Sequence, residues 1–310
     1  MVLLITREIP PAVAARAAAE HEVRQLALTG PFEPETLLAN LAGVTAILCT
    51  ATDKFPAPLI AQLPPAIKVI ATYSVGLEHI DLPAAAAKNI VICNTPDVLN
   101  AATAEIALTL ILMSARRAGE GERRLRAGQW QGLAPTYHLG RQVSGKTLGI
   151  FGMGRIGREL ATLARALKMQ IHYHNRTRLP PELEQGATYH EDEATFLPAI
   201  DFLSLNTPGG PETHHWLNAA RIAQLRPTAI VINTGRGTIV DDTALIAALK
   251  SGRILAAGLD VFENEPNLNP DYLTLENAVL LPHIGSATVE TRNAMGFLAL
   301  DGIARALAKN

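Results

Sequence analysis

The sequence predicts an α/β protein with two Rossmann-like or flavodoxin-like domains, each built on a parallel sheet. Short apolar runs alternate with Ala-rich helical patterns along nearly the whole chain, and this order is typical of parallel sheets. A glycine-rich turn, Gly152 to Gly157, stands between one apolar run and one helical pattern. The length of 310 residues is large for a single core and suits two domains of about 150 residues each.

The first hundred residues contain five apolar runs that we interpret as strands. The expected strands are Val2–Thr6, Glu22–Leu26, Thr45–Thr50, Lys68–Tyr73 and Ile90–Asn94. Helical patterns at Pro11–Glu20, Glu35–Ala42 and Leu82–Lys88 lie between them. These residues therefore form one α/β unit.

The remainder of the chain begins with a helical pattern, Ala101–Ala127, rich in Ala, Leu and Arg. A second strand-and-helix series follows, with strands expected at Thr147–Gly152, Gln170–His174, Phe202–Asn206, Ala229–Asn233, Ala256–Val261 and Val279–Pro282. A last helix is expected over Val289–Lys309, and its periodicity does not say on which unit it packs.

Composition narrows the class of protein. With 48% hydrophobic residues, 18% charged residues and a net charge of −2, the chain has no global field that would attract nucleic acid or an anionic membrane. The first residues lack the charged region of a signal peptide, and the longest apolar stretch, Ile106–Ala115, is too short to span a bilayer. Cys49 and Cys93 both end apolar runs, so we expect buried, reduced thiols. We expect a soluble, cytoplasmic protein.

The glycine-rich turn predicts a dinucleotide site. Gly152 would permit the turn, Gly154 the close approach of a pyrophosphate, and Gly157 the packing of the helix on the strand. The G-x-G-x-x-G spacing alone is weak evidence for a dinucleotide site. Its place at a strand-to-helix junction makes the motif more specific.

The end of the next strand indicates which dinucleotide binds. NAD sites usually carry Asp or Glu there, on the ribose 2′-hydroxyl, whereas this chain has Asn175, Arg176 and Thr177. A carboxylate would repel a 2′-phosphate, while a guanidinium can bind it in a bidentate manner. We therefore expect a preference for NADP(H), with NAD(H) possible; the alternative is a solvated basic turn.

Three later strand ends carry polar side chains that could perform chemistry. Arg236 stands between Gly235 and Gly237, three carboxylates lie in the segment 260–265, and His283 follows the last strand. Each has a plainer interpretation: a surface arginine, a solvated acidic loop and a structural histidine. Together they would suit reduction of a 2-oxo acid, which needs a cation for the substrate, an acid for the carbonyl oxygen and a carboxylate to keep that acid protonated. No metal site is expected.

The chain resembles the D-isomer-specific 2-hydroxyacid dehydrogenases over essentially its whole length. The resemblance rests on four motifs in the correct order, together with Tyr73–Asp81 in the first unit: Gly152–Gly157, Asn233–Gly237, Gly258–Pro266 and Pro282–Thr288. It implies the catalytic residues Arg236, Glu265 and His283. Arg236 would bind the 2-oxo acid, and His283 would donate a proton with Glu265 as its partner.

The resemblance also implies binding residues. Val75 and Gly76 would hold the substrate carboxylate through their backbone amides, together with Arg236 and Ser286. The cofactor contacts that it implies are Thr103, Gly152, Met153, Gly154, Arg155, Ile156, Gly157, Asn175, Arg176, Thr177, Asn206, Thr207, Pro208, Thr234, Gly235, Arg236, Asp260, His283 and Gly285. Asp260 matches the acid near the nicotinamide amide, a role separate from that of Glu265.

At the level of organisation, the resemblance implies a substrate-binding domain of residues 1–98 and 287–310 and a dinucleotide-binding domain of residues 99–286. The active site would lie in the cleft between them. Family members are usually homodimers through the cofactor domain, and Trp130 would reach the partner's active site or anchor the dimer interface.

Within the family, Asn175-Arg176-Thr177 and Gly128-Gln129-Trp130 are most similar to the NADP-dependent glyoxylate and hydroxypyruvate reductases. We therefore expect NADPH-dependent reduction of one of these acids to the D-2-hydroxy acid. One alternative is a bulkier substrate, 2-ketogluconate or an aryl pyruvate. An alternative of another class is a dinucleotide-sensing binding protein similar to the C-terminal-binding-protein corepressors.

Overall fold

The computed structural model, described here for residues 1–308, divides into two compact units. The first contains residues 1–99 and 287 onward, and the second contains residues 100–286. The boundary lies one residue later than the sequence indicated. No helix among the described residues is long and apolar enough to cross a membrane.

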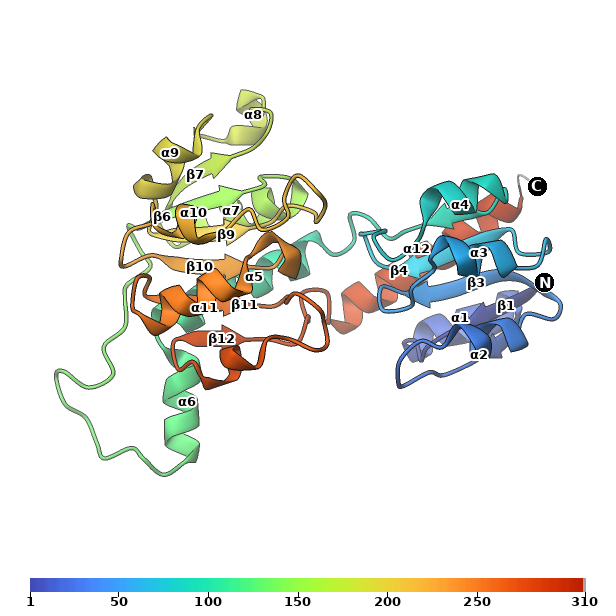
Figure 1. The fold of residues 1–310 in the computed structure, drawn as a ribbon, viewed down its shortest axis with the longest axis horizontal. Helices are drawn as coiled ribbons and strands as arrows, with labels where there is room; N and C mark the ends of the chain where they lie inside the picture. Colours follow the sequence, from blue (N-terminus) through green and yellow to red (C-terminus); the bar gives the residue numbers. More distant parts are fainter. Residues whose placement is uncertain (309–310) are drawn as a thin grey trace. The chain divides into compact units, whose positions relative to one another are not determined.

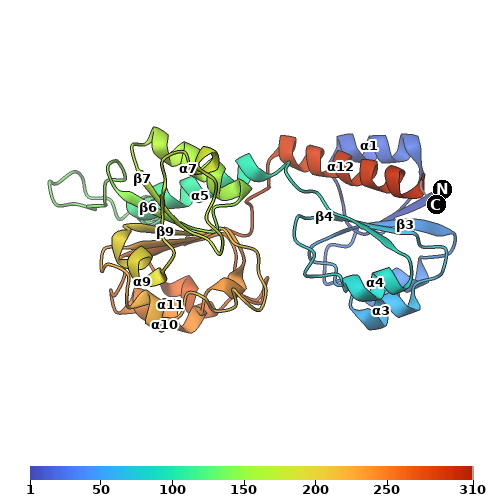
Figure 2. The same ribbon diagram turned by 90° about the horizontal axis from the view of Figure 1, so that it is seen from above.

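The first unit is a five-stranded parallel sheet in the order β2-β1-β3-β4-β5. Its elements are β1 (Val2–Ile5), α1 (Pro11–Glu20), β2 (Glu22–Gln25), α2 (Pro34–Ala39), β3 (Val44–Thr50), α3 (Ala57–Gln62), β4 (Val69–Tyr73), α4 (Leu82–Ala87), β5 (Val91–Cys93) and α12 (Val289–Leu307). Figure 2 shows α1 and α12 on one face of the sheet and α3 and α4 on the other.

The second unit is a seven-stranded parallel sheet in the order β12-β11-β10-β9-β6-β7-β8. Its helices are α5 (Asn100–Ala115), α6 (Ala118–Arg126), α7 (Arg155–Ala166), α8 (Pro181–Glu184), α9 (Glu193–Phe196), α10 (Ala219–Ile222) and α11 (Asp242–Lys250), with short 3-10 turns η1 (Leu197–Ala199), η2 (Gly237–Ile239) and η3 (Pro270–Thr274). Its strands are β6 (Thr147–Phe151), β7 (Gln170–His174), β8 (Thr188–Tyr189), β9 (Phe202–Leu205), β10 (Ile230–Asn233), β11 (Ala256–Leu259) and β12 (Ala278–Leu280).

Both faces of the second sheet are buried. Successive β10 residues belong to opposite cores: Ile230 and Ile232 pack under α5 and α7, and Val231 packs on the side of α10 and α11. A strand covered on both faces needs apolar residues at every position, because each side chain enters one core or the other. The continuous apolar runs in the sequence follow from this burial.

The expected strands are all present, with ends within two residues of the prediction, and the two-sheet α/β class is confirmed. β8 was not expected, because two residues are too few to form an apolar run. The last helix ends at Leu307, and the predicted end at Lys309 lies outside the described residues. That helix packs on β4 and α1, which settles the question that periodicity left open.

The single helix expected over Ala101–Ala127 is wrong, because the structure contains two helices there, α5 and α6. Arg117 adopts a left-handed conformation (φ +52°) between them. The returning chain caps α5, since the Arg141 N–H donates to the Ala115 carbonyl over 2.7 Å. The Arg117 guanidinium then bonds the buried Glu120 carboxylate. The contact between Arg141 and Ala115 joins residues far apart in the sequence, so it leaves no trace in the local periodicity.

Candidate functional site

The polar residues singled out in the second unit lie where its strands end. All strands of this sheet are parallel, so the ends of β6, β7, β9, β10, β11 and β12 lie at one edge (Figure 1). Ligands of open parallel sheets bind at this edge.

The glycine-rich turn between β6 and α7 has three distinct local environments. Gly152 has a φ of +93°, and a Cβ there would lie 2.6 Å from the Thr207 side chain. A Cβ on Gly157 would lie 2.7 Å from the Gly152 carbonyl oxygen, so this glycine lets α7 approach β6. A Cβ on Gly154 would meet nothing within 4 Å. Two glycines are therefore needed for packing, and the third faces open space at the start of the helix.

Asn175, at the end of β7, is bonded to the same turn. Its Oδ1 accepts the Met153 backbone N–H over 2.7 Å, so the side chain helps to fix the glycine-rich turn. Arg176 is exposed and pairs with the exposed Glu212. Arg178 bonds the buried Glu184 carboxylate, which also accepts the Tyr173 hydroxyl. Both arginines are exposed, but Arg176 pairs with an exposed carboxylate and Arg178 with a buried one.

The end of β9 adds hydroxyl and amide groups beside Gly152. Asn206 accepts the Ser204 hydroxyl and donates its amide to Thr234 Oγ1. The buried Thr207 hydroxyl has no hydrogen-bond partner. Because a buried polar group without a partner is costly, this hydroxyl is available to a ligand seated against the turn.

Arg236 is carried by a loop whose glycines serve packing rather than ligand access. A Cβ on Gly235 would lie 2.8 Å from the Thr207 carbonyl oxygen. A Cβ on Gly237 would lie only 1.8 Å from the backbone carbon of Phe262. The Asn233 side chain closes the loop by donating to the Arg236 carbonyl and accepting the Gly235 N–H. The position of Arg236 is thus set by backbone contacts with the neighbouring loops.

The three carboxylates after β11 serve three different partners. Asp260 accepts the backbone N–H groups of Ile284 and Gly285 over 2.7 and 2.8 Å. Glu265 bonds His283, and Glu263 contacts His214 and His215. Each of the three acids therefore has a partner, although the segment 264–267 is exposed.

Glu265 and His283 form the pair that the family resemblance implied. Glu265 Oε2 lies 2.7 Å from His283 Nδ1, and Oε1 accepts the Phe262 N–H over 2.8 Å. Burial alone would raise the pKa of Glu265, but the hydrogen bond from His283 and its charge outweigh burial and lower the pKa. Glu265 is thus a carboxylate at neutral pH, and it presents the other ring nitrogen, Nε2, for chemistry.

Asp260 anchors the loop that carries His283. The carboxylate is 1% exposed, and this burial raises its pKa, while the two N–H bonds from the His283 loop oppose the rise. A Cβ on Gly285 would lie 3.1 Å from Asp260 Oδ2 and 3.5 Å from the Thr103 methyl group. Gly285 therefore lies close to both Thr103 and Asp260.

The remaining predicted binding residues lie in both units. Val75 and Gly76 follow β4 in the first unit, and their carbonyl oxygens accept the Asn94 amide and the Ser74 hydroxyl. These bonds fix the orientation of the two peptide groups. Ser286 ends the second unit. Trp130 is 54% exposed on the segment after α6.

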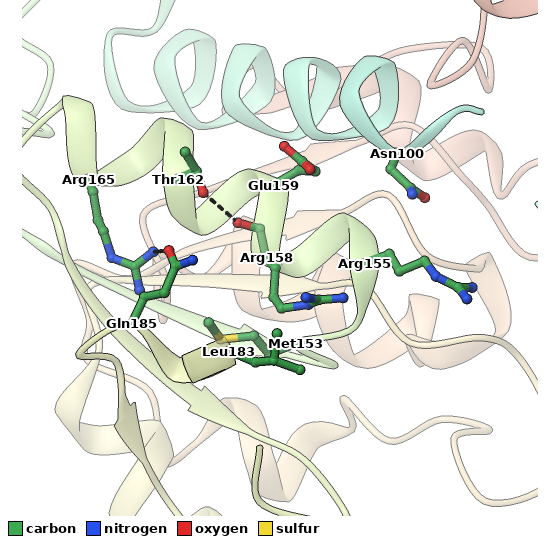
Figure 3. A pocket seen from close by; sticks show the side chains of 9 residues that line it. All are labelled: Asn100, Met153, Arg155, Arg158, Glu159, Thr162, Arg165, Leu183 and Gln185. Atoms are coloured by element: carbon green, nitrogen blue, oxygen red, sulfur yellow. Dashed lines mark hydrogen bonds between the residues drawn. The ribbon is translucent and has the colours of Figure 1, made fainter. Parts of the chain in front are cut away.

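A basic pocket borders the glycine-rich turn (Figure 3). Its volume is about 270 Å³, and it is lined by Asn100, Met153, Arg155, Arg158, Glu159, Thr162, Arg165, Leu183 and Gln185. Arg165 is bonded to Gln185 and to the Glu184 carbonyl. The pocket places positive charge beside the same turn.

The residues present fit a dinucleotide. Gly154 leaves open space at the start of α7, where the backbone N–H groups of a helix attract phosphate, and the buried Thr207 hydroxyl lacks a partner beside Gly152. Sequence reasoning missed the bond from Met153 to Asn175, because it depends on the register of β6 and β7. It also missed the contact between Glu263 and two histidines, for which the His214-His215 pair was the available signal.

Comparisons with known proteins show which family the chain is similar to. A family model, D-isomer specific 2-hydroxyacid dehydrogenase, NAD binding domain, matches residues 108–285. The chain is 41% identical over 301 residues to a glycerate dehydrogenase of Hyphomicrobium methylovorum, covering 96% of this chain and 94% of that protein. It is 43% identical over 278 residues to a glyoxylate reductase of Thermococcus litoralis, covering 88% and 81%.

A solved structure gives a similar result. The NADPH-dependent glyoxylate/hydroxypyruvate reductase of Sinorhizobium meliloti, in complex with NADP and malonate, superimposes with a TM-score of 0.86 at 37% identity. The match covers 98% of this chain and 92% of that chain.

The contrast between Gly154 and Gly157 yields a prediction. We expect Gly157→Ala to destabilise the protein by about 1–3 kcal/mol, since the added methyl has no room between α7 and β6. Gly154→Ala should change stability by less than about 0.5 kcal/mol yet weaken dinucleotide binding, since its methyl enters the phosphate space. Thermal unfolding and NADPH fluorescence titration measure the two effects. Equal NADPH affinity in Gly154→Ala and the unsubstituted protein would contradict the assignment of this space.

Proposed function

We propose that this chain, which belongs to the D-isomer specific 2-hydroxyacid dehydrogenase family, reduces glyoxylate or hydroxypyruvate with NADPH to the D-2-hydroxy acid. The observation that carries the proposal is the bond of 2.7 Å between Glu265 and His283 at the carboxyl edge of a dinucleotide-type sheet. Relatives named glyoxylate reductase, and a neighbour named for NADPH-dependent reduction of glyoxylate and hydroxypyruvate, support the choice of substrate.

In this mechanism, a bound nicotinamide dinucleotide supplies the hydride that the protein itself lacks. Arg236 binds the substrate carboxylate and polarises the carbonyl oxygen, because its planar guanidinium can donate to two oxygens at once. His283 protonates the developing alkoxide from Nε2. Glu265 is a positioning residue, because its carboxylate accepts the Nδ1–H of His283 and so fixes the orientation of the ring. We further propose that the backbone amides of Val75 and Gly76, and Ser286, contact the substrate.

The preference for NADPH rests on charge near the end of β7. Position 175 is Asn rather than the Asp or Glu of a typical NAD site, and the exposed Arg176 follows it. Arg155 and Arg158 add positive charge around the adjoining turn. These charges favour a doubly negative 2′-phosphate over a neutral hydroxyl. The other cofactor contacts that the resemblance implies, Ile156 and Pro208 among them, form part of this proposal.

A homodimer is also part of the proposal. The segment from α6 to β6 exposes several large apolar side chains, a pattern typical of a protein interface. They are Leu125, Trp130, Leu133 and Leu139, with exposed fractions of 59%, 54%, 92% and 63%. A second copy of this chain would cover them. Both cysteines are free, which agrees with a reducing, cytoplasmic location.

Initial rates test the function directly. With NADPH, we expect a higher kcat/KM for glyoxylate and hydroxypyruvate than for 2-ketogluconate or an aryl pyruvate. With either of the two small acids, we expect a higher kcat/KM for NADPH than for NADH. Faster reduction of the bulkier acids would favour the alternative substrate class. Tight NADPH binding without turnover of any 2-oxo acid would favour a dinucleotide-sensing protein instead.

The pair of His283 and Glu265 gives a prediction for the pH profile. We expect His283→Ala to lower kcat about 10²- to 10⁴-fold, the usual loss for a general acid. Glu265→Gln should move the high-pH limb of kcat/KM to lower pH, because it removes a negative charge 2.7 Å from the ring. That charge is present throughout the neutral range, since the pKa of Glu265 is lowered. An unchanged limb in Glu265→Gln would show that this carboxylate does not tune the acid.

Cofactor choice gives a further prediction. Asn175→Asp combined with Arg176→Ala should shift the ratio of NADPH to NADH efficiency toward NADH, because it adds a negative charge and removes a positive one. The new carboxylate can still accept the Met153 N–H, so the turn should keep its shape. Glu212→Gln is the matched control, since it breaks the same ion pair but leaves Arg176 in place. An efficiency ratio that does not move in the double variant would rule out the phosphate site at this turn.

A further inference from the structure

Two histidines and one glutamate meet on the second unit, and none of the three is assigned to the reaction. Glu263 carboxylate oxygens lie 3.3 Å from His215 Nε2 and 3.9 Å from His214 Nε2. The two imidazole rings stack at 4.0 Å with an angle of 22°. Within residues 1–308 these three form the one group of at least three His, Cys, Asp or Glu residues whose donor atoms all lie within 4.8 Å.

We propose that His214, His215 and Glu263 bind a divalent transition-metal ion of the zinc type. Ligand atoms about 2.1 Å from a tetrahedral zinc ion lie about 3.4 Å apart, and the donor atoms here all lie within 4.8 Å of one another. Binding would require the stacked rings of His214 and His215 to rotate apart, so that both Nε2 atoms point to one ion. Two imidazole nitrogens and one carboxylate are a donor set that suits Zn²⁺ and disfavours Mg²⁺ and Ca²⁺, which prefer oxygen ligands.

The backbone of the cluster is held in place before any ion binds. His215 has a φ of +47°, and its N–H donates to the Thr238 carbonyl over 2.8 Å. Leu217 then pairs with Val240 in a β-bridge. On the other side, the backbone at Phe262 and Glu263 packs against Gly237. Neither loop needs to fold around the metal, which keeps the entropic cost of binding low.

The cluster is open to solvent on one side. The side chains of His214, His215 and Glu263 are 54%, 36% and 25% exposed, so a cation can enter without local unfolding. A neighbouring pocket of about 370 Å³ includes His215 and Glu263 and is lined further by Asp241, Asp242 and Asn264 among others. Water or one of these oxygens would complete the coordination. Three protein ligands would leave a fourth coordination position open.

The ion would connect two loops that flank Arg236. His214 and His215 follow β9, Glu263 follows β11, and β10 lies between these strands in the sheet. Because the loop after β10 carries Arg236, the metal would hold together the segments on both of its sides. Its effect would therefore be to stabilise the arrangement of these loops.

Metal binding alone tests the proposal, without any measurement of activity. The full-length protein is treated with a chelator. Zn²⁺ is then titrated at neutral pH by calorimetry, and Co²⁺ is titrated separately by visible absorption. We expect about one ion per chain and a rise in the unfolding temperature, because the ion binds the folded state. The double variant His214→Gln/His215→Gln should weaken binding by at least about tenfold and abolish the rise.

Two variants control for other imidazoles. His190→Gln removes a ring of the His172–His190 pair in the same unit, and His283→Ala removes the ring bonded to Glu265. Both should keep the affinity for Zn²⁺ and the tetrahedral Co²⁺ spectrum. Unchanged affinity in the folded double variant, or loss of binding in His283→Ala or His190→Gln instead, would overturn the proposal.

Discussion

The buried Asp260 carboxylate holds the candidate site together. Both of its oxygens accept N–H groups of the loop after β12, at Ile284 and Gly285, and the residue before them is His283. A buried carboxylate is costly unless it is hydrogen-bonded, so this loop cannot move away without leaving a desolvated charge. His283 itself has a left-handed backbone conformation (φ +54°), which a rigid anchor can maintain.

The same edge of the sheet is braced by backbone contacts. Gly235 and Gly237 bring the loop after β10 against its neighbours on both sides, at Thr207 and Phe262. Phe262 in turn donates its N–H to Glu265, which holds His283. The His283–Glu265 pair and the loop of Arg236 thus share one network of short contacts. This kind of support keeps charged side chains in fixed positions, which catalysis of proton and hydride transfer requires.

Much of this arrangement could be predicted from the sequence, because parallel sheets impose strong local patterns. Apolar runs gave the strands, and polar residues at strand ends indicated the edge where His283 and Glu265 are found together. The break at Arg117 could not be predicted, since the cap of α5 comes from Arg141. The roles of the glycines beside Arg236 were also hidden, because the residues they contact follow other strands.

The central claim is that Arg236 and the His283–Glu265 pair act on one substrate beside the glycine-rich turn. A crystal structure of the protein with NADPH and oxamate, an unreactive mimic of a 2-oxo acid, tests it most directly. We predict that the oxamate carboxylate bonds Arg236, that its carbonyl oxygen lies within hydrogen-bond distance of His283 Nε2, and that the nicotinamide ring faces its carbonyl carbon. Oxamate bound away from both side chains, with the dinucleotide in place, would contradict the account.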